Sequence, residues 1–295
     1  MTLRISFILC LTLLWQSLIS QSSELYIVDL LQVADKYEAT NGRYLSHFNA
    51  GGYTNQPSFA DPYTLLISVG MQDTPLATDL YELNLRTRRK TRITRTTERE
   101  YSPVISQLDP KYISCVLVEP ENDNKQVIWQ YPYDRSNGGR PLLSGTGQVG
   151  YFAELKDAWI AVFEVGSPNK LWLYNEESGE KKFITANVGR SLQRSGDGSL
   201  VYVHKFSDDY WFLKKLNLED LRSEIIKKTI TGAEDFVLLA DDSIIMGSQS
   251  KLYHLDPNGG VTWSEIADLS DMGIKNITRL AFNGINQLAI VDQRE

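Results

Sequence analysis

The feature that most constrains this chain is a short apolar strand that recurs six times along its length. Each copy carries aromatic residues among aliphatic ones, with the aromatics shifted in the fifth copy. The copies stand roughly 40 to 55 residues apart, a period that is typical of repeat architectures. They are Leu25–Leu30, Leu80–Leu85, Ile128–Tyr131, Leu171–Tyr174, Tyr210–Leu213 and Leu252–Asp256.

Two further markers accompany each copy in a fixed order. An aliphatic–hydroxyl pair follows the strand, and then a tight turn joins two apolar runs. The pairs are Leu45-Ser46, Ile93-Thr94, Leu143-Ser144, Ile184-Thr185 and Ile230-Thr231, with a blurred copy at Trp263–Ile266. The turns are Asp61-Pro62, Asp109-Pro110, Lys156-Asp157, Gly196–Gly198, Asp241-Asp242 and Asn283-Gly284. Three markers in one order predict an all-β, six-bladed β-propeller with four antiparallel strands per blade.

The phase of the repeat predicts how the ring closes. The chain begins with the third and fourth strands of a blade, and it ends at Asn276–Val291 with the first and second strands of a blade. These two halves must pair for the last blade to be complete. We therefore expect N- and C-terminal strands to share one blade, which covers sheet edges that would otherwise be open to aggregation.

The repeat resembles that of the TolB-like propeller family, also described as PD40 or WD40-like. The resemblance rests on the strand Asp-Leu-Tyr-Glu-Leu-Asn-Leu at 79–85, the closing Ile-Thr or Leu-Ser pair, and the turn at Gly196–Gly198. It covers residues 23–295 and implies one bare propeller domain without the N-terminal domain of TolB. The family's Ser-Pro-Asp-Gly turn is degenerate in the other copies.

The first 22 residues predict a secretory signal peptide. Arg4 precedes an apolar run, Ile5–Ile19, and small residues follow near positions 20–23. The alternative is an uncleaved N-terminal anchor. No later segment is long and apolar enough to span a bilayer. The sequence thus predicts a protein that is periplasmic or otherwise exported after cleavage of the signal peptide.

Charge and cysteine content restrict the partners and the chemistry. The formal net charge is −7, and removal of Arg4 with the leader takes it to −8. This balance argues against nucleic acid as a partner. Cys115 is then the single cysteine, and its apolar neighbours predict a buried, inert thiol.

Motifs that carry chemistry are weak in this chain. No Gly-x-Ser-x-Gly elbow is present, which excludes a prolyl-oligopeptidase type of hydrolase. Gly145–Gly150 matches a dinucleotide motif by letters, but no helix is expected after it. His47, His204 and His254 fall on different blades, so we predict neither a metal nor a cofactor.

Candidate binding residues follow from position in the blade. The second-to-third-strand loops and the connections between blades emerge on one face, which we call the loop face; its loops include residues 71–78, 119–125, 166–169 and 206–210. Loops on a rigid scaffold commonly carry binding sites. The residues expected to rim the central channel there are Gln56, Glu100, Gln148, Arg190, Glu234 and Arg279, with Asp208 and Trp211 nearby on the loop face.

These observations predict a non-catalytic scaffold of the cell envelope, a monomer that binds a protein, a peptide or a glycan through the loop face. The alternative is a lyase or glycoside hydrolase that acts on an acidic sugar in the central funnel. That alternative needs a pair of carboxylates, for which Glu100 and Glu234 are the candidates.

Overall fold

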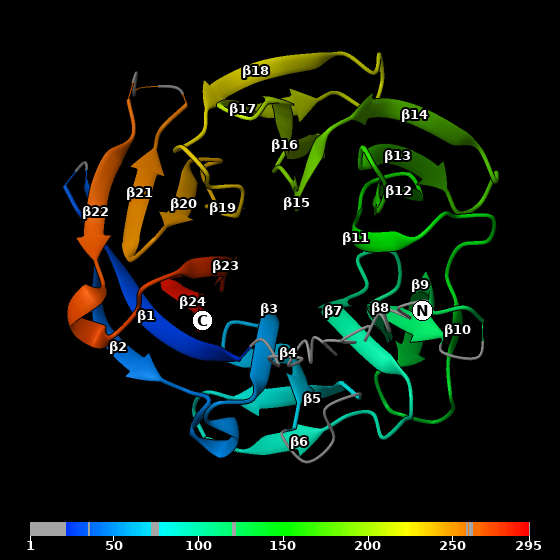
Figure 1. The fold of residues 1–295 in the computed structure, drawn as a ribbon, viewed down its shortest axis with the longest axis horizontal. Coiled ribbons are helices and arrows are strands. Elements are labelled where there is room, and N and C mark those ends of the chain that lie inside the picture. The colour runs from blue at the N-terminus through cyan, green and yellow to red at the C-terminus, as the bar shows by residue number, and fades with distance from the viewer. Residues whose placement is uncertain are drawn as a thin grey trace, which may run out of the picture.

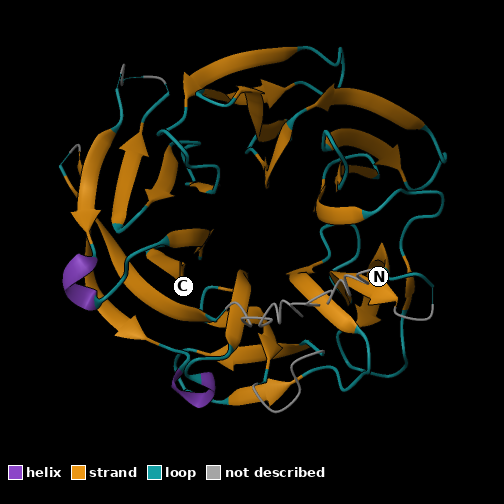
Figure 2. Ribbon diagram, viewed as in Figure 1, coloured by secondary structure: helices purple, strands orange, loops and turns teal. Residues whose placement is uncertain are grey.

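The structure is a computed structural model that describes residues 22–34, 36–71, 77–119, 122–257, 259 and 262–294. Strands are arranged in a ring around a central axis (Figures 1 and 2), and the only helices among the described residues are two short 3₁₀ turns, His47–Asn49 and Ser270–Met272. Within this part of the chain no helix is long and apolar enough to cross a membrane. The predicted signal peptide lies outside the described residues, apart from Ser22.

Four antiparallel sheets of four strands make up most of the ring. Their strands are β7 (Arg99–Ile105), β8 (Tyr112–Glu119), β9 (Lys125–Pro132) and β10 (Arg140–Pro141); β11 (Val149–Glu154), β12 (Trp159–Glu164), β13 (Lys170–Asn175) and β14 (Lys181–Ala186); β15 (Val188–Arg194), β16 (Leu200–Ser207), β17 (Tyr210–Leu216) and β18 (Ser223–Lys228); and β19 (Phe236–Leu238), β20 (Ile244–Ser248), β21 (Lys251–Leu255) and β22 (Ser264–Asp268).

The fifth sheet has eight strands. It contains β23 (Ile277–Phe282), β24 (Gln287–Gln293), β1 (Ser23–Val33) and β2 (Lys36–Tyr44), followed by β3 (Tyr53–Asp61), β4 (Thr64–Gly70), β5 (Asp79–Asn84) and β6 (Lys90–Arg92). A single parallel pairing, Ser23 with Tyr53, joins its two antiparallel halves.

The predicted markers fall where the repeat placed them. Every aromatic strand is the third strand of an antiparallel set, and in two copies the hydroxyl of the aliphatic–hydroxyl pair binds the backbone of that strand. The Thr94 hydroxyl accepts a hydrogen bond from the Leu80 amide at 2.8 Å, and the Ser46 hydroxyl accepts one from the Leu25 amide at 2.9 Å. The hydroxyl residue thus satisfies a buried backbone donor in both copies.

Chain ends meet in one sheet, as the phase of the repeat predicts. β1 pairs antiparallel with β24 over seven residue pairs, from Ser23 with Gln293 to Asp29 with Gln287. Arg294 reinforces this pairing, because its Nε donates to Glu24 at 2.9 Å and lies 3.0 Å from an Asp292 carboxylate oxygen. Asp292 is fully buried and also accepts from the Lys275 and Asn276 amides.

Apolar cores fill the spaces between neighbouring sheets. One core joins Leu66 and Leu80 of one sheet to Ile113 and Cys115 of the next. The Cys115 thiol is fully buried, as predicted, and burial raises its pKa well above the ordinary value.

Antiparallel neighbours place the connections alternately at two opposite faces of the ring. The connections between consecutive sheets lie on the loop face, together with the second-to-third-strand loops. The first-to-second-strand hairpins lie on the other face, which we call the hairpin face; they contain Pro62, Pro110, Gly196 and Ile285. Residues 72–76, 120 and 121 of the predicted loop-face segments lie outside the described residues.

Glu100 is a buried carboxylic acid within β7. The Tyr131 hydroxyl donates to its Oε1 at 3.1 Å, the Thr96 hydroxyl also donates to that oxygen, and Oε2 has no hydrogen-bond partner among the described residues. Burial raises the pKa of Glu100 to about 7. A buried carboxyl that prefers its neutral form destabilises the fold when it ionises.

We expect loss of Arg294 to weaken ring closure. Arg294→Ala leaves the buried Asp292 carboxylate without its cation, and breaking such a pair is costly even when the arginine is partly exposed. The free energy of unfolding should fall by about 2 kcal/mol in urea denaturation. Arg222→Ala is the matched control, since the Arg222 side chain is 85% exposed and lies 3.7 Å from Asp220. Equal losses in the two variants would contradict the role of Arg294 in closure.

We expect Glu100 to make stability depend on pH. Folding raises the pKa of Glu100 from 4.5 to about 7. The stabilisation of the fold by the neutral Glu100 carboxyl is therefore complete below pH 4.5 and is lost as the pH rises through 7. Glu100→Gln does not titrate. The variant should therefore gain about 2 to 3 kcal/mol relative to the natural protein between pH 5 and pH 8. Parallel curves of unfolding free energy against pH would show that Glu100 does not carry this dependence.

Candidate functional site

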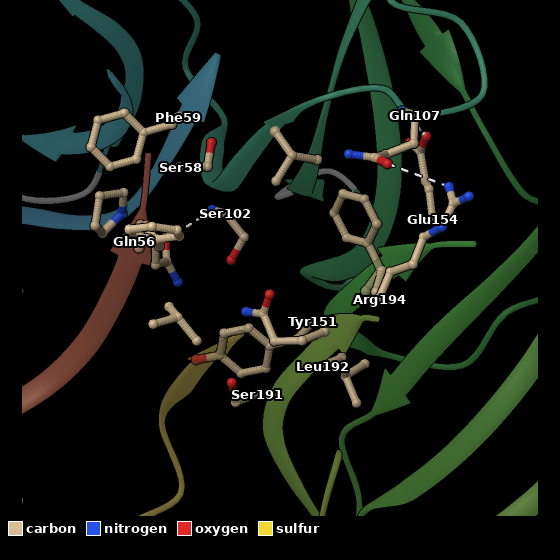
Figure 3. Close-up of a pocket in the computed structure, with 18 of the residues that line it drawn as sticks. Gln56, Ser58, Phe59, Ser102, Gln107, Tyr151, Glu154, Ser191, Leu192 and Arg194 are labelled. Atoms are coloured by element: carbon tan, nitrogen blue, oxygen red, sulfur yellow. Dashed lines mark hydrogen bonds between the residues drawn. The ribbon is translucent and has the colours of Figure 1, made fainter. Parts of the chain in front are cut away.

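A cavity of about 860 Å³ occupies the centre of the ring. Its lining residues come from β3, β7, β11, β15, β19 and β23, which are the innermost strands of the sheets, together with the turns and connection next to them. Figure 3 shows side chains from these strands converging on a common space, with the Ser102 hydroxyl and the Tyr151 ring directed into it. Every part of the ring therefore contributes to one site.

Five of the innermost strands carry an irregularity in register near their beginning. In β3 the pairing with β4 shifts between Asn55 and Ser58, and in β7 it shifts between Tyr101 and Val104. The other three shifts lie in β11 between Val149 and Tyr151, in β15 between Val188 and Leu192, and in β23 between Ile277 and Arg279. Bulges of this kind re-aim side chains and are frequent beside functional sites.

Two of these bulges contain a residue in the left-handed region just before a proline. Gln56 has φ of 53° and Ser102 has φ of 52°. That conformation is uncommon for residues other than glycine, and a following proline normally favours extended backbone. A hydrogen bond joins the two bulges, since the Ser102 amide donates to the Gln56 side-chain oxygen at 3.0 Å.

A hydrogen bond crosses the channel between strands on opposite sides of the ring. The Arg279 guanidinium on β23 donates to the Tyr151 hydroxyl on β11 at 2.6 Å and to the Thr278 carbonyl at 2.6 Å. Arg190 on β15 reaches the same Thr278 carbonyl at 2.9 Å. β11 and β23 face each other across the centre in Figure 1. These side chains form a bar across the channel at its loop-face end.

Carboxylates partly balance the arginines of the bar. Glu234 lies 2.8 Å from the Lys205 ammonium and 3.4 Å from Arg190 Nε. Burial acts to raise the pKa of Glu234, but Arg190 and Lys205 outweigh it, so the pKa is lowered. Asp235 lies 3.8 Å from Arg279 and accepts from the Leu280 amide, yet burial raises its pKa.

The predicted site residues divide into two groups. Gln56, Arg190 and Arg279 line the cavity. Glu234 is not part of its described lining but forms an ion pair with Arg190. The remaining four predicted residues are absent from the described lining of the cavity: Glu100 is buried, Gln148 accepts from the Gln126 amide, and Asp208 and Trp211 lie on or beside the β16–β17 turn.

Glu100 and Glu234 are not brought together as a carboxylate pair. Glu100 contacts Thr96 and Tyr131, whereas Glu234 contacts Arg190 and Lys205. Their strands, β7 and the segment before β19, stand on opposite sides of the ring in Figure 1.

Two residues of the site, Ser102 and Tyr151, were not identified from the sequence, whereas Asp235 was expected on the loop face with Glu234. The dipeptides Gln56-Pro57 and Ser102-Pro103 could have indicated the bulges of β3 and β7 from the sequence, because proline inside a strand marks an edge or a bulge. Both occur at the same level of an innermost strand.

No group of three or more histidine, cysteine, aspartate or glutamate side chains within the described ranges is arranged to hold a metal ion. The three histidines instead make aromatic contacts in separate places: His47 with Tyr44, with ring centroids 4.2 Å apart, His254 with Tyr37, at 4.7 Å, and His204 with Phe206, at 6.3 Å.

Large apolar side chains are exposed on the loop face, two of them beside the β16–β17 turn. Phe206 is 73% exposed and Tyr210 is 53% exposed, while Val165, on the loop between β12 and β13, is 50% exposed. Trp211 stands beside them, with the Lys205 ammonium 4.1 Å from its ring centroid. Exposed aromatic residues of this kind commonly anchor interfaces.

No protein-family model matches the chain, and no curated protein matches it. Solved structures do resemble it. A protein from Agrobacterium tumefaciens assigned as TolB is 12% identical with a TM-score of 0.67, over 94% of this chain and 99% of that one. TolB from Acinetobacter baumannii is 14% identical with a TM-score of 0.57, over 92% of this chain and 64% of that one.

An oligogalacturonate lyase from Vibrio parahaemolyticus is 11% identical with a TM-score of 0.51, over 92% of this chain and 98% of that one. At such identities a structural likeness reports on the fold and not on the activity. The fold of this chain is a TolB-like β-propeller.

Proposed function

We propose that this protein is an exported, non-catalytic binding protein of the cell envelope, which engages a partner protein or peptide through its loop face. Residues 1–22 act as the signal peptide and residues 23–295 form one propeller domain. The eight-stranded sheet counts as two blades, because only the Ser23–Tyr53 pairing joins its antiparallel halves, and the ring then has six blades.

The exposed aromatic residues Phe206 and Tyr210 beside the β16–β17 turn, with Val165 exposed on another loop of the same face, carry this proposal. Apolar side chains on a rigid hairpin lose little conformational freedom when a partner covers them. Beside them, the bar between Arg279 and Tyr151 crosses the channel, so the loop face offers a surface to a partner instead of an open funnel.

The alternative, an enzyme that acts on an acidic sugar, draws on the likeness to the oligogalacturonate lyase and on the arginines of the cavity. Its two nominated carboxylates, Glu100 and Glu234, have separate partners. This arrangement favours the binding role.

We expect a partner to crosslink to the β16–β17 turn. A photoreactive amino acid at position 208, which is exposed on that turn, should yield one dominant crosslinked species in cells. Phe206→Ala in the same background should reduce the yield about fivefold, because it removes an apolar anchor worth about 1 kcal/mol. Ile285→Ala is the matched control, since Ile285 is 59% exposed on the hairpin face. Absence of a discrete species, or an equal reduction by both substitutions, would contradict the proposal.

We also expect no turnover of oligogalacturonate. A lyase would form a carbon–carbon double bond in the product, which absorbs in the ultraviolet. Purified protein incubated with oligogalacturonate should leave the absorbance at the level of a boiled sample. A rate that disappears in Arg190→Ala, with the variant still folded, would establish the enzymatic alternative in place of the binding role.

A further inference from the structure

The central cavity extends toward the hairpin face. Its lining reaches Pro110 and Gly196, which belong to first-to-second-strand hairpins. Of the connections between consecutive sheets, only Asp235 is part of the described lining. Since the bar of Tyr151, Arg190 and Arg279 closes the loop-face end, the cavity is a pocket with its mouth on the hairpin face.

Positive charge prevails inside this pocket. The charged residues of its described lining are Arg190, Arg194, Arg279, Glu154 and Asp235, that is, three arginines against two carboxylates. The protein as a whole carries a formal net charge of −7. A locally positive cavity in an acidic protein attracts small anions selectively.

The two carboxylates of the pocket balance the arginines only in part, because Asp235 pairs with Arg279 while Glu154 is engaged elsewhere. Glu154 is buried and accepts four hydrogen bonds, from the Ser106 and Ser114 hydroxyls and from the Gln107 and Leu108 amides. Asp235 lies 3.8 Å from Arg279, beyond hydrogen-bonding distance.

Hydrogen-bond donors converge at the blind end. The Ser102 hydroxyl is buried and has no partner among the described residues. Arg190 Nε makes no hydrogen bond within these residues, but it lies 3.4 Å from a Glu234 carboxylate oxygen, so its charge is partly answered there. The Tyr151 hydroxyl accepts from Arg279, so its own hydrogen can be donated to an anion. Figure 3 shows Ser102 and Tyr151 directed into the same space.

Apolar side chains separate this polar end from the mouth. Val104, Leu192, Val237 and Ala281 line the pocket between the two ends of the innermost strands. From Arg190 to Arg194 the strand covers four residue steps, or about 13 Å at the usual rise. The pocket thus combines a cationic, donor-rich end with a wall of apolar and polar side chains that spans this distance.

We propose that this pocket binds a small organic carboxylate whose head lies against Tyr151, Ser102 and the two arginines of the bar. The apolar body of the ligand extends along the channel toward the hairpin face, through which it enters. An extended chain of about eight carbons is shorter than the distance of about 13 Å from Arg190 to Arg194 and therefore fits within the pocket. This site is separate from the partner surface on the loop face and holds whether or not that surface binds a protein.

Octanoate is the probe, and isothermal titration calorimetry is the measurement. We expect octanoate to bind with one site per chain, and 1-octanol and acetate to bind at least about tenfold more weakly, because each lacks either the charged head or the apolar body. Tyr151→Phe should weaken octanoate binding about tenfold, since it removes one donor and keeps the ring.

Two substitutions test the direction of access. Gly196→Phe places a ring at the hairpin-face mouth, where an added Cβ meets only ordinary contacts with the Asp242 carboxylate at 3.5 Å and beyond. It should weaken octanoate binding at least about tenfold. Asp208→Trp adds similar bulk on the loop face and should change the affinity less than about twofold.

Three results would overturn this inference. The first is the absence of octanoate binding at millimolar concentration by the folded natural protein. The second is equal affinity for octanoate and 1-octanol, which would leave no role for the arginines. The third is octanoate binding that Gly196→Phe leaves unchanged. None of them depends on partner crosslinking at position 208, so this inference and the proposed function can fail separately.

Discussion

The antiparallel pairing of β1 with β24 is the interaction on which the rest of the structure depends. β23 reaches the ring through β24, and β24 is held to β1 by seven residue pairs. Arg279 lies on β23, so its hydrogen bond to Tyr151 across the channel requires a closed ring. An open ring would also expose two strand edges, which invites pairing with other chains. Closure therefore sets the stability of the fold and the geometry of the site together.

The register shifts near the beginning of the innermost strands explain how a regular repeat acquires a specific site. A strand with strict alternation sends its side chains in turn toward the two neighbouring sheets. An added residue interrupts that alternation and turns a side chain toward the axis. The shifts in β3, β7, β11, β15 and β23 lie at corresponding places, so the re-aimed side chains meet at one level of the channel. The left-handed Gln56 and Ser102 show that this arrangement carries local backbone strain, which the surrounding sheets hold in place.

The same shifts explain why the sequence predicts the fold better than the site. Strand order and the pairing of the chain ends are predicted from markers that recur in six copies. One degenerate copy therefore does not change the predicted fold. Which residue faces the channel depends on a single inserted position. In β7 the sequence nominates Glu100, but Ser102 lines the cavity two residues further on. Near β11 it nominates Gln148, and Tyr151 lines the cavity instead. Arg190 and Arg279 were nominated because they enter the innermost strands, and they line the cavity because the bulges in β15 and β23 lie at those residues.

Glu234 connects the two surfaces of the molecule. It contacts Arg190, which belongs to the bar, and Lys205, whose ammonium lies over the Trp211 ring beside the loop face. A buried carboxylate that loses its only cation incurs a large desolvation cost. Glu234 is half-buried and has two cations, with the Lys205 ammonium at 2.8 Å and Arg190 Nε at 3.4 Å. Its charge is therefore shared between the bar and the loop face.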